Sequence, residues 1–117
     1  MRKLIVTSLL AMTLAGCGIN SVTPEEIGAI KAGDILTWRY SKATDAGNSW
    51  LYCERVEKVD GDNVTFVPSI NEGTSKTMPS LREFSDKQDT TTITELKKFA
   101  SEQGEDKKVI IEIEHKE

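Results

Sequence analysis

The chain has 117 residues, of which 38% are hydrophobic, and its 15 basic and 19 acidic side chains give a formal net charge of −4. This length is enough for one globular domain and too short for two. A negatively charged surface gains nothing from phosphate backbones, so the composition argues against binding to nucleic acid.

The first sixteen residues have the layout of a cleaved export signal. Two basic residues at positions 2 and 3 precede an uncharged, mostly apolar stretch over 4–14, and the small pair Ala15-Gly16 follows. The apolar stretch is much shorter than the roughly 20 residues that a membrane-spanning helix needs. We therefore expect residues 1–16 to be removed.

The segment Leu14-Ala15-Gly16-Cys17, written LAGC, resembles the lipobox of bacterial lipoproteins. This resemblance implies cleavage before Cys17, a diacylglycerol group on the Cys17 thiol, and acylation of the new amino terminus with a fatty acid such as palmitate. In Gram-negative lipoproteins an aspartate after the cysteine commonly marks retention in the inner membrane, and here that position is Gly18. The resemblance therefore implies a lipid-anchored protein of the outer membrane. It does not distinguish a domain that faces the periplasm from one that faces the outside, and we expect the periplasmic side.

Cleavage before Cys17 would leave 101 residues with 13 basic and 19 acidic side chains, a net charge of −6. We expect a lipidated tether over 17–22 and a single globular domain over 23–117. Only Cys53 then remains as a thiol, which excludes an internal disulfide. Cys53 is either a reactive thiol that can form an intermolecular bridge or a small buried hydrophobe on a strand.

Local patterns predict the first elements of this domain. TPEE at 23–26 combines an N-cap threonine, a proline at the first helical position and a glutamate three residues after the cap, so a short helix should run through Ile30 and end near Gly33. Alternating side chains predict strands at 35–40, at about 50–59 and at 64–67. The segment DGDN at 60–63 predicts a hairpin turn before the last of them.

The second half gives a less regular pattern. Residues 69–90 are polar and turn-forming, with Met78, Leu81 and Phe84 as candidates for one more edge strand. A capping pattern at Thr92-x-x-Glu95 predicts a second helix that ends at Gly104. The segment VIIEIEH at 109–115 predicts a final strand with its first, third and fifth residues facing inward.

These elements predict a small α+β domain. A three-stranded meander, a helix and a returning strand fit either a small antiparallel β-sheet or an SH3-like half-open barrel, with one or two short helices.

All tryptophans and tyrosines of the chain, Trp38, Tyr40, Trp50 and Tyr52, lie within fifteen residues on two predicted neighbouring strands. Paired across a hairpin, they could form an aromatic platform that binds a glycan strand, a peptide or a partner protein. Alternatively they line the core, where a small domain needs large side chains.

The sequence argues against catalysis. The single histidine, His115, has no ligand or catalytic partner at a useful spacing and is expected to be a solvated terminal side chain. The carboxylates, including Glu54, Glu57, Asp60 and Asp62, show no catalytic pattern and are expected on the solvated face. No glycine-rich phosphate loop, G-x-S-x-G or Cys-x-x-Cys motif is present, so neither a cofactor nor a metal site is predicted.

The sequence thus predicts a non-catalytic binding or accessory module of the outer membrane, whose partner is an envelope protein or a component of the cell wall. The alternative is a protective inhibitor or exclusion lipoprotein, an acidic protein that neutralises a basic toxic enzyme or blocks the uptake of a phage or plasmid.

Overall fold

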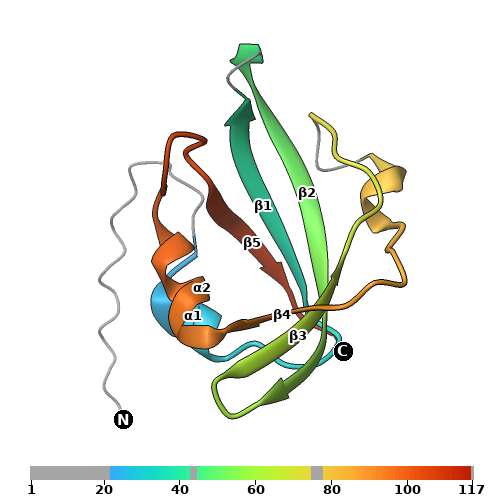
Figure 1. Ribbon diagram of the computed structural model, residues 1–117, viewed down its shortest axis with the longest axis vertical. Helices are drawn as coiled ribbons and strands as arrows, with labels where there is room; N and C mark the ends of the chain where they lie inside the picture. Colours follow the sequence, from blue (N-terminus) through green and yellow to red (C-terminus); the bar gives the residue numbers. More distant parts are fainter. Residues whose placement is uncertain (1–21, 43–44, 75–77, 117) are drawn as a thin grey trace, which may run out of the picture.

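The computed structural model describes residues 22–42, 45–74 and 78–116, which form a small α+β domain around one antiparallel sheet (Figure 1). The strands are β1 (Ile35–Lys42), β2 (Asp45–Asp60), β3 (Asn63–Pro68), β4 (Asp89–Thr92) and β5 (Val109–Glu114). The helices are α1 (Pro24–Gly28) and α2 (Ile93–Lys97), with 3-10 turns η2 (Pro79–Arg82) and η3 (Lys98–Ala100).

The sheet is open and its strands follow the order β4-β3-β2-β1-β5. The predicted meander is confirmed as β1, β2 and β3, and the predicted returning strand is β5, which pairs antiparallel with β1. Of the two architectures that the sequence allowed, the observed one is the antiparallel sheet.

The register of β1 against β2 decides which side chains share a face. Trp38 lies opposite Tyr52, and Tyr40 lies opposite Trp50. Directly opposed residues point to the same side of a sheet, so all four rings lie on one face, which we call the aromatic face. Leu51 and Cys53 alternate with them and point to the other face, as the sequence predicts.

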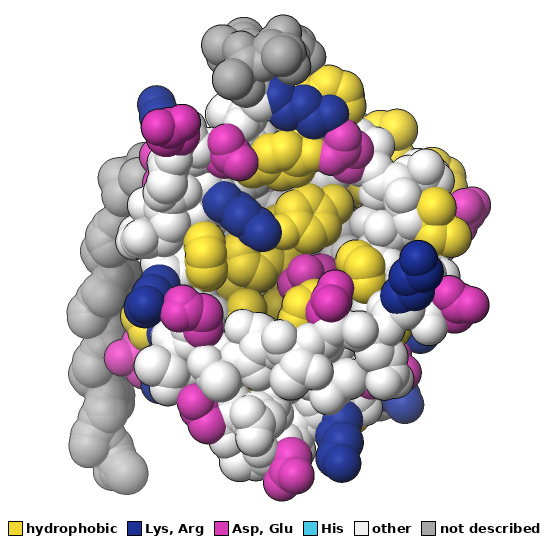
Figure 2. All heavy atoms as spheres, in the orientation of Figure 1, with side chains coloured by type: hydrophobic (Ala, Val, Ile, Leu, Met, Phe, Trp, Pro, Cys, Tyr) yellow, Lys and Arg dark blue, Asp and Glu magenta, His cyan; other side chains and the backbone are white. Residues whose placement is uncertain are grey.

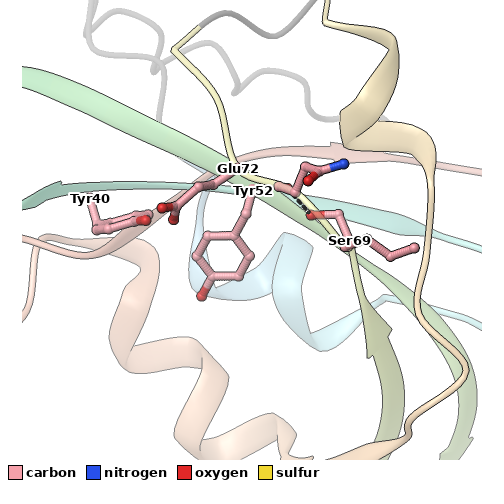
Figure 3. A pocket seen from close by; sticks show the side chains of 6 residues that line it. Tyr40, Tyr52, Ser69 and Glu72 are labelled. Atoms are coloured by element: carbon pink, nitrogen blue, oxygen red, sulfur yellow. Dashed lines mark hydrogen bonds between the residues drawn. The ribbon is translucent and has the colours of Figure 1, made fainter.

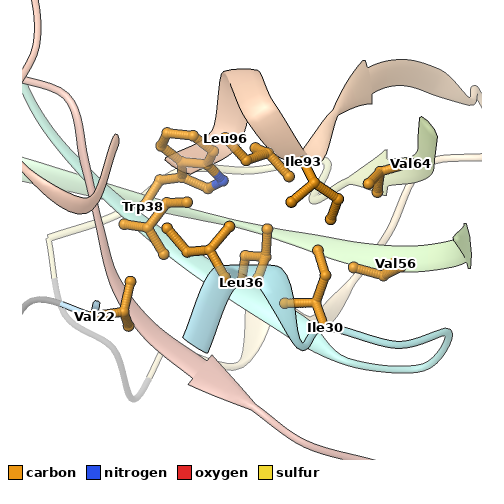
Figure 4. Packing of buried hydrophobic residues seen from close by; sticks show 10 residues of the cluster. Val22, Ile30, Leu36, Trp38, Val56, Val64, Ile93 and Leu96 are labelled. Atoms are coloured by element: carbon orange, nitrogen blue, oxygen red, sulfur yellow. The ribbon is translucent and has the colours of Figure 1, made fainter. Parts of the chain in front are cut away.

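The main core lies between the aromatic face and the two helices (Figure 4). Both helices begin at a threonine whose side chain accepts a backbone N–H three residues later, Thr23 for α1 and Thr92 for α2. Burying one large aliphatic side chain contributes about 1.5–3 kcal/mol, so this cluster supplies most of the stability. Its buried members are Val22, Ile27, Ile30, Leu36, Trp38, Val56, Val64, Ile93, Leu96 and Ile110.

Both helices end earlier than predicted. The first ends at Gly28 and the second helical segment ends at Ala100, so the predicted ends near Gly33 and Gly104 are wrong. Both of these glycines have a positive φ, +97° and +75°, within later turns. A glycine signals a left-handed backbone position, which a tight turn uses as readily as a helix end does.

The opposite face of the sheet is covered by the segment that follows β3. Leu81 of η2 packs with Leu51 and Cys53 in a second buried cluster, and Met78 and Phe84 pack against it. These three apolar residues of the segment therefore do not form an edge strand, apart from one isolated bridge between Phe84 and Ser69. The edge strand is β4, which begins later, at Asp89.

The final strand departs from simple alternation. The pairing of β1 with β5 shifts between Thr37 and Trp38, where a bulge adds one residue to β5. Val109 and Ile110 are both buried as a result, whereas Ile111 is half-buried against the second cluster.

Candidate functional site: an aromatic groove

The four predicted site aromatics lie together and differ in burial. Trp38 is 3% exposed and belongs to the main core, whereas Tyr40, Trp50 and Tyr52 are half-buried. The ring of Tyr52 stacks on Trp38, with 6.0 Å between centroids, and meets Tyr40 edge to face at 5.8 Å. The rings therefore form a row that runs from the core to the surface.

Tyr40 and Tyr52 line a groove of about 550 Å³, which we call the Tyr40 groove (Figure 3). Its opposite side is the segment 69–72, which continues from β3 alongside β2. The Ser69 hydroxyl donates to the backbone oxygen of Asn71 over 2.8 Å and so shapes this segment. Next to Ser69, Ile70 is 63% exposed and is the only large hydrophobic side chain that is exposed in the described part of the chain.

An ionic pair borders the groove. The ammonium group of Lys42 lies 4.0 Å from the ring centre of Trp50 and also contacts the carboxylate of Glu72. The indole N–H of Trp50 is buried and, among the described residues, has no hydrogen-bond partner. A buried indole usually donates a hydrogen bond, so the described residues leave this donor unused.

A second cation lies deeper on the same face. The Lys108 ammonium is 4.6 Å from the ring centre of Trp38, 5.3 Å from Tyr52 and 5.8 Å from Phe99. Cation–π attraction operates within about 6 Å, so all three rings attract this charge. We call these three rings the aromatic cage. Figure 2 shows hydrophobic side chains gathered in a hollow over β1, β2 and β5, with charged side chains around it.

A buried carboxylate lies beneath these rings. Glu54 is 7% exposed and accepts a hydrogen bond of 2.8 Å from the indole N–H of Trp38. Burial raises the pKa of Glu54 to about 7, since the Trp38 hydrogen bond and the charge of Lys108 offset it only in part, and Asp89 raises it further. The expectation that Glu54 belongs to the solvated face is therefore wrong.

The Tyr52 hydroxyl stays neutral in this surrounding. Burial and, to a lesser extent, the charge of Glu54 raise the pKa of Tyr52 far above its ordinary value. Tyr52 thus presents a neutral phenol to the groove rather than a phenolate.

His115 follows directly after β5 and has a partner that is distant in the sequence. Its Nδ1 is 3.1 Å from a carboxylate oxygen of the buried Asp34. Burial alone would raise the pKa of Asp34, but hydrogen bonds from the backbone N–H groups of Lys116 and Lys31 and from His115 outweigh it and lower this pKa. This arrangement ties the end of the described chain to the start of β1.

Other candidate chemistry can be placed as well. Cys53 is buried in the second cluster with Leu51 and Leu81, which is where a small hydrophobe is expected. Its Sγ also lies 3.6 Å from the Thr37 hydroxyl and 3.4 Å from an Arg82 nitrogen. Within 22–42, 45–74 and 78–116, no group of three or more His, Cys, Asp or Glu residues could hold a metal ion. Cys17 lies outside the described residues, and in the described part no helix has the length and hydropathy of a membrane span.

Sequence reasoning missed four contributors to this site: Glu54, Phe99, Lys108 and the segment 69–72. Glu54 carried a usable signal, because it follows Tyr52 by two residues on the same strand and must share its face. The other three reach the aromatic face only through tertiary packing.

No protein-family model, curated protein or solved structure matches this chain.

Proposed function

We propose that this chain is a lipid-anchored, non-catalytic binding module of the outer membrane whose Tyr40 groove receives an envelope partner. The observation that carries this proposal is the row of half-buried rings beside the exposed Ile70. Aromatic and aliphatic side chains left accessible in a groove are typical of a binding surface.

The anchor is proposed from the LAGC segment and limits where the partner lies. Val22 is buried and its backbone N–H bonds to Ile110 of β5, so the domain is fixed from that residue onward. Five extended steps from Cys17 to Val22 span at most about 18 Å. The domain must therefore lie close to the membrane surface, and the partner must be able to reach it there.

Replacement of Cys17 tests the anchor. Cells grown with labelled palmitate should incorporate label into the wild-type chain and lose it in Cys17→Ala, because the acylated residue is gone. The matched control is Cys53→Ala, which removes the other cysteine and should keep the label. Retention of label in Cys17→Ala, or its loss in both variants, would contradict the anchor.

Photo-crosslinking in living cells tests the groove. A photoreactive phenylalanine analogue at Tyr40 or at Ile70 should give the same discrete adduct, because the two positions face one groove from opposite sides. Lys97 is the control, since it is exposed on α2, away from the groove. An adduct from Lys97 alone, or none from any position in a folded and anchored protein, would reject the groove as the binding surface.

A protective inhibitor of a basic enzyme is the second candidate. The net charge of −6 proposed for the processed chain favours it, because opposite charge accelerates association. The identity of the crosslinked protein distinguishes the two candidates. It would be a resident envelope component in the first case and an incoming basic enzyme in the second.

A further inference from the structure

The aromatic cage is built without any help from Lys108. Its rings come from β1, β2 and η3, and Trp38 meets Phe99 edge to face with 5.0 Å between centroids. The Trp38 ring is also fixed by its N–H bond to Glu54. A carboxylate that accepts from an indole N–H increases the negative charge on the ring face, and this favours a cation above it.

The occupant comes from a separate segment. Lys108 follows a turn over 104–107 that is closed by paired backbone hydrogen bonds between Gln103 and Lys108, each of 3.0 Å. Within this turn Lys107 has φ of +51°, a conformation that a residue with a side chain adopts at a cost of about 1 kcal/mol. Lys108 is half-buried, so part of this residue remains accessible to solvent.

We propose that the aromatic cage is a receptor site for a lysine side chain of the protein partner, and that Lys108 occupies it while the partner is absent. This inference rests on the proposed function and names the group that the partner presents. The cation that occupies the cage is the Lys108 ammonium on its four-carbon side chain, so the site accommodates a group of that shape. Tyr52 belongs both to the aromatic cage and to the Tyr40 groove, which gives the residues beside the partner's lysine a continuous surface.

The acidic side chains near the aromatic cage also favour a lysine side chain as its occupant. A neighbouring hollow of about 400 Å³ is lined by Phe99 and Lys108 together with the acidic Glu105 and Asp106. These two carboxylates attract a positive side chain toward the rings.

Occupation of the aromatic cage by Lys108 should lower the apparent affinity of the cage for a lysine side chain from outside. When a site is free for only a fraction of the time, the apparent Kd is the intrinsic Kd divided by that fraction. Removing the Lys108 ammonium should therefore tighten the binding of an added lysine side chain.

The test uses the full-length protein in a detergent that carries no ammonium group. Nα-acetyl-lysine-N-methylamide is added, and Kd is measured from the shift of the Trp38 indole N–H signal in NMR spectra. Lys108→Ala should bind this probe at least about fivefold more tightly than the wild type, which corresponds to one modest cation–π contact. Lys97→Ala is the control with the same change of charge and should match the wild type. Lys108→Gln gives an independent second variant of the same position.

Further arms identify the ligand chemistry. The gain should disappear when Phe99→Leu is added to Lys108→Ala, and the norleucine analogue of the probe, which lacks the ammonium, should show no gain. Equal affinity in wild type, Lys108→Ala and Lys108→Gln would overturn the proposal, and so would tighter binding of choline than of the lysine probe, which would indicate a lipid headgroup. Crosslinking from Tyr40 is independent of Lys108, so a failed cage and a failed groove are distinguishable.

Discussion

Glu54→Gln is expected to raise the free energy of unfolding by about 3 kcal/mol at pH 8 and to leave it nearly unchanged at pH 4. Glutamine keeps an oxygen that can accept the Trp38 N–H and removes the charge that burial disfavours. The pKa of Glu54 is about 7 in the folded protein against an ordinary value of 4.5. Each unit of this difference corresponds to about 1.4 kcal/mol.

The direction of this pH dependence follows from whether the folded or the unfolded state holds the Glu54 proton. Well below pH 4.5 the Glu54 carboxyl is protonated in both the folded and the unfolded state and does not lower the free energy of unfolding. As the pH rises toward 7, the unfolded chain releases this proton while the folded protein keeps it, so the wild type loses stability until the folded carboxyl ionises as well. Glu54→Gln should abolish this loss.

Urea unfolding between pH 4 and pH 8 measures the difference between variant and wild type. The matched control is Glu57→Gln, which lies on the same strand and forms a surface ion pair with Arg55. It should keep the wild-type dependence on pH. A constant difference between Glu54→Gln and wild type over this range would show that Glu54 ionises normally.

Trp38→Leu is expected to lower the free energy of unfolding by about 4 kcal/mol at pH 7. The ring is 3% exposed and packs between Tyr52 and Phe99. The substitution leaves a cavity that the neighbouring rings cannot fill, and it also removes the only hydrogen bond described for the Glu54 carboxylate. Both the cavity and the lost hydrogen bond lower the free energy of unfolding.

Trp50→Leu provides the comparison, since it deletes the same atoms from a half-buried ring whose N–H has no described partner. Its cost should stay below about 1.5 kcal/mol. Similar losses of stability for the two variants in urea unfolding would contradict the assignment of Trp38 to the core and of Trp50 to a half-buried position.

Much of the fold is readable from local sequence because it depends on local physics. The DGDN turn places β3 after β2, and the cap threonines start both helices where the sequence predicts. The alternation around Trp38 and Tyr52 fixes the shared face of the rings. These features depend only on residues that are close together in the sequence.

The site needs contacts that local patterns do not encode. A charged residue on a strand ordinarily faces water, so Glu54 looks solvated until the residues that pack around it, Trp38 and Lys108 among them, are placed. Lys108 reaches rings about 50 to 70 residues earlier in the chain only because β5 returns beside β1. The segment 69–72 offers no periodic pattern, and its position comes from hydrogen bonds to β2.

The open sheet has one further consequence, which concerns self-association. An unprotected edge strand recruits strands from other copies and leads to aggregation. Here β4 is only four residues long and runs directly into α2, while β5 is partly covered by Val22 and carries the exposed carboxylates of Glu112 and Glu114. The short length of β4, together with the coverage and the acidic side chains of β5, should keep neighbouring copies from joining into a continuous sheet, even when many of them are crowded together.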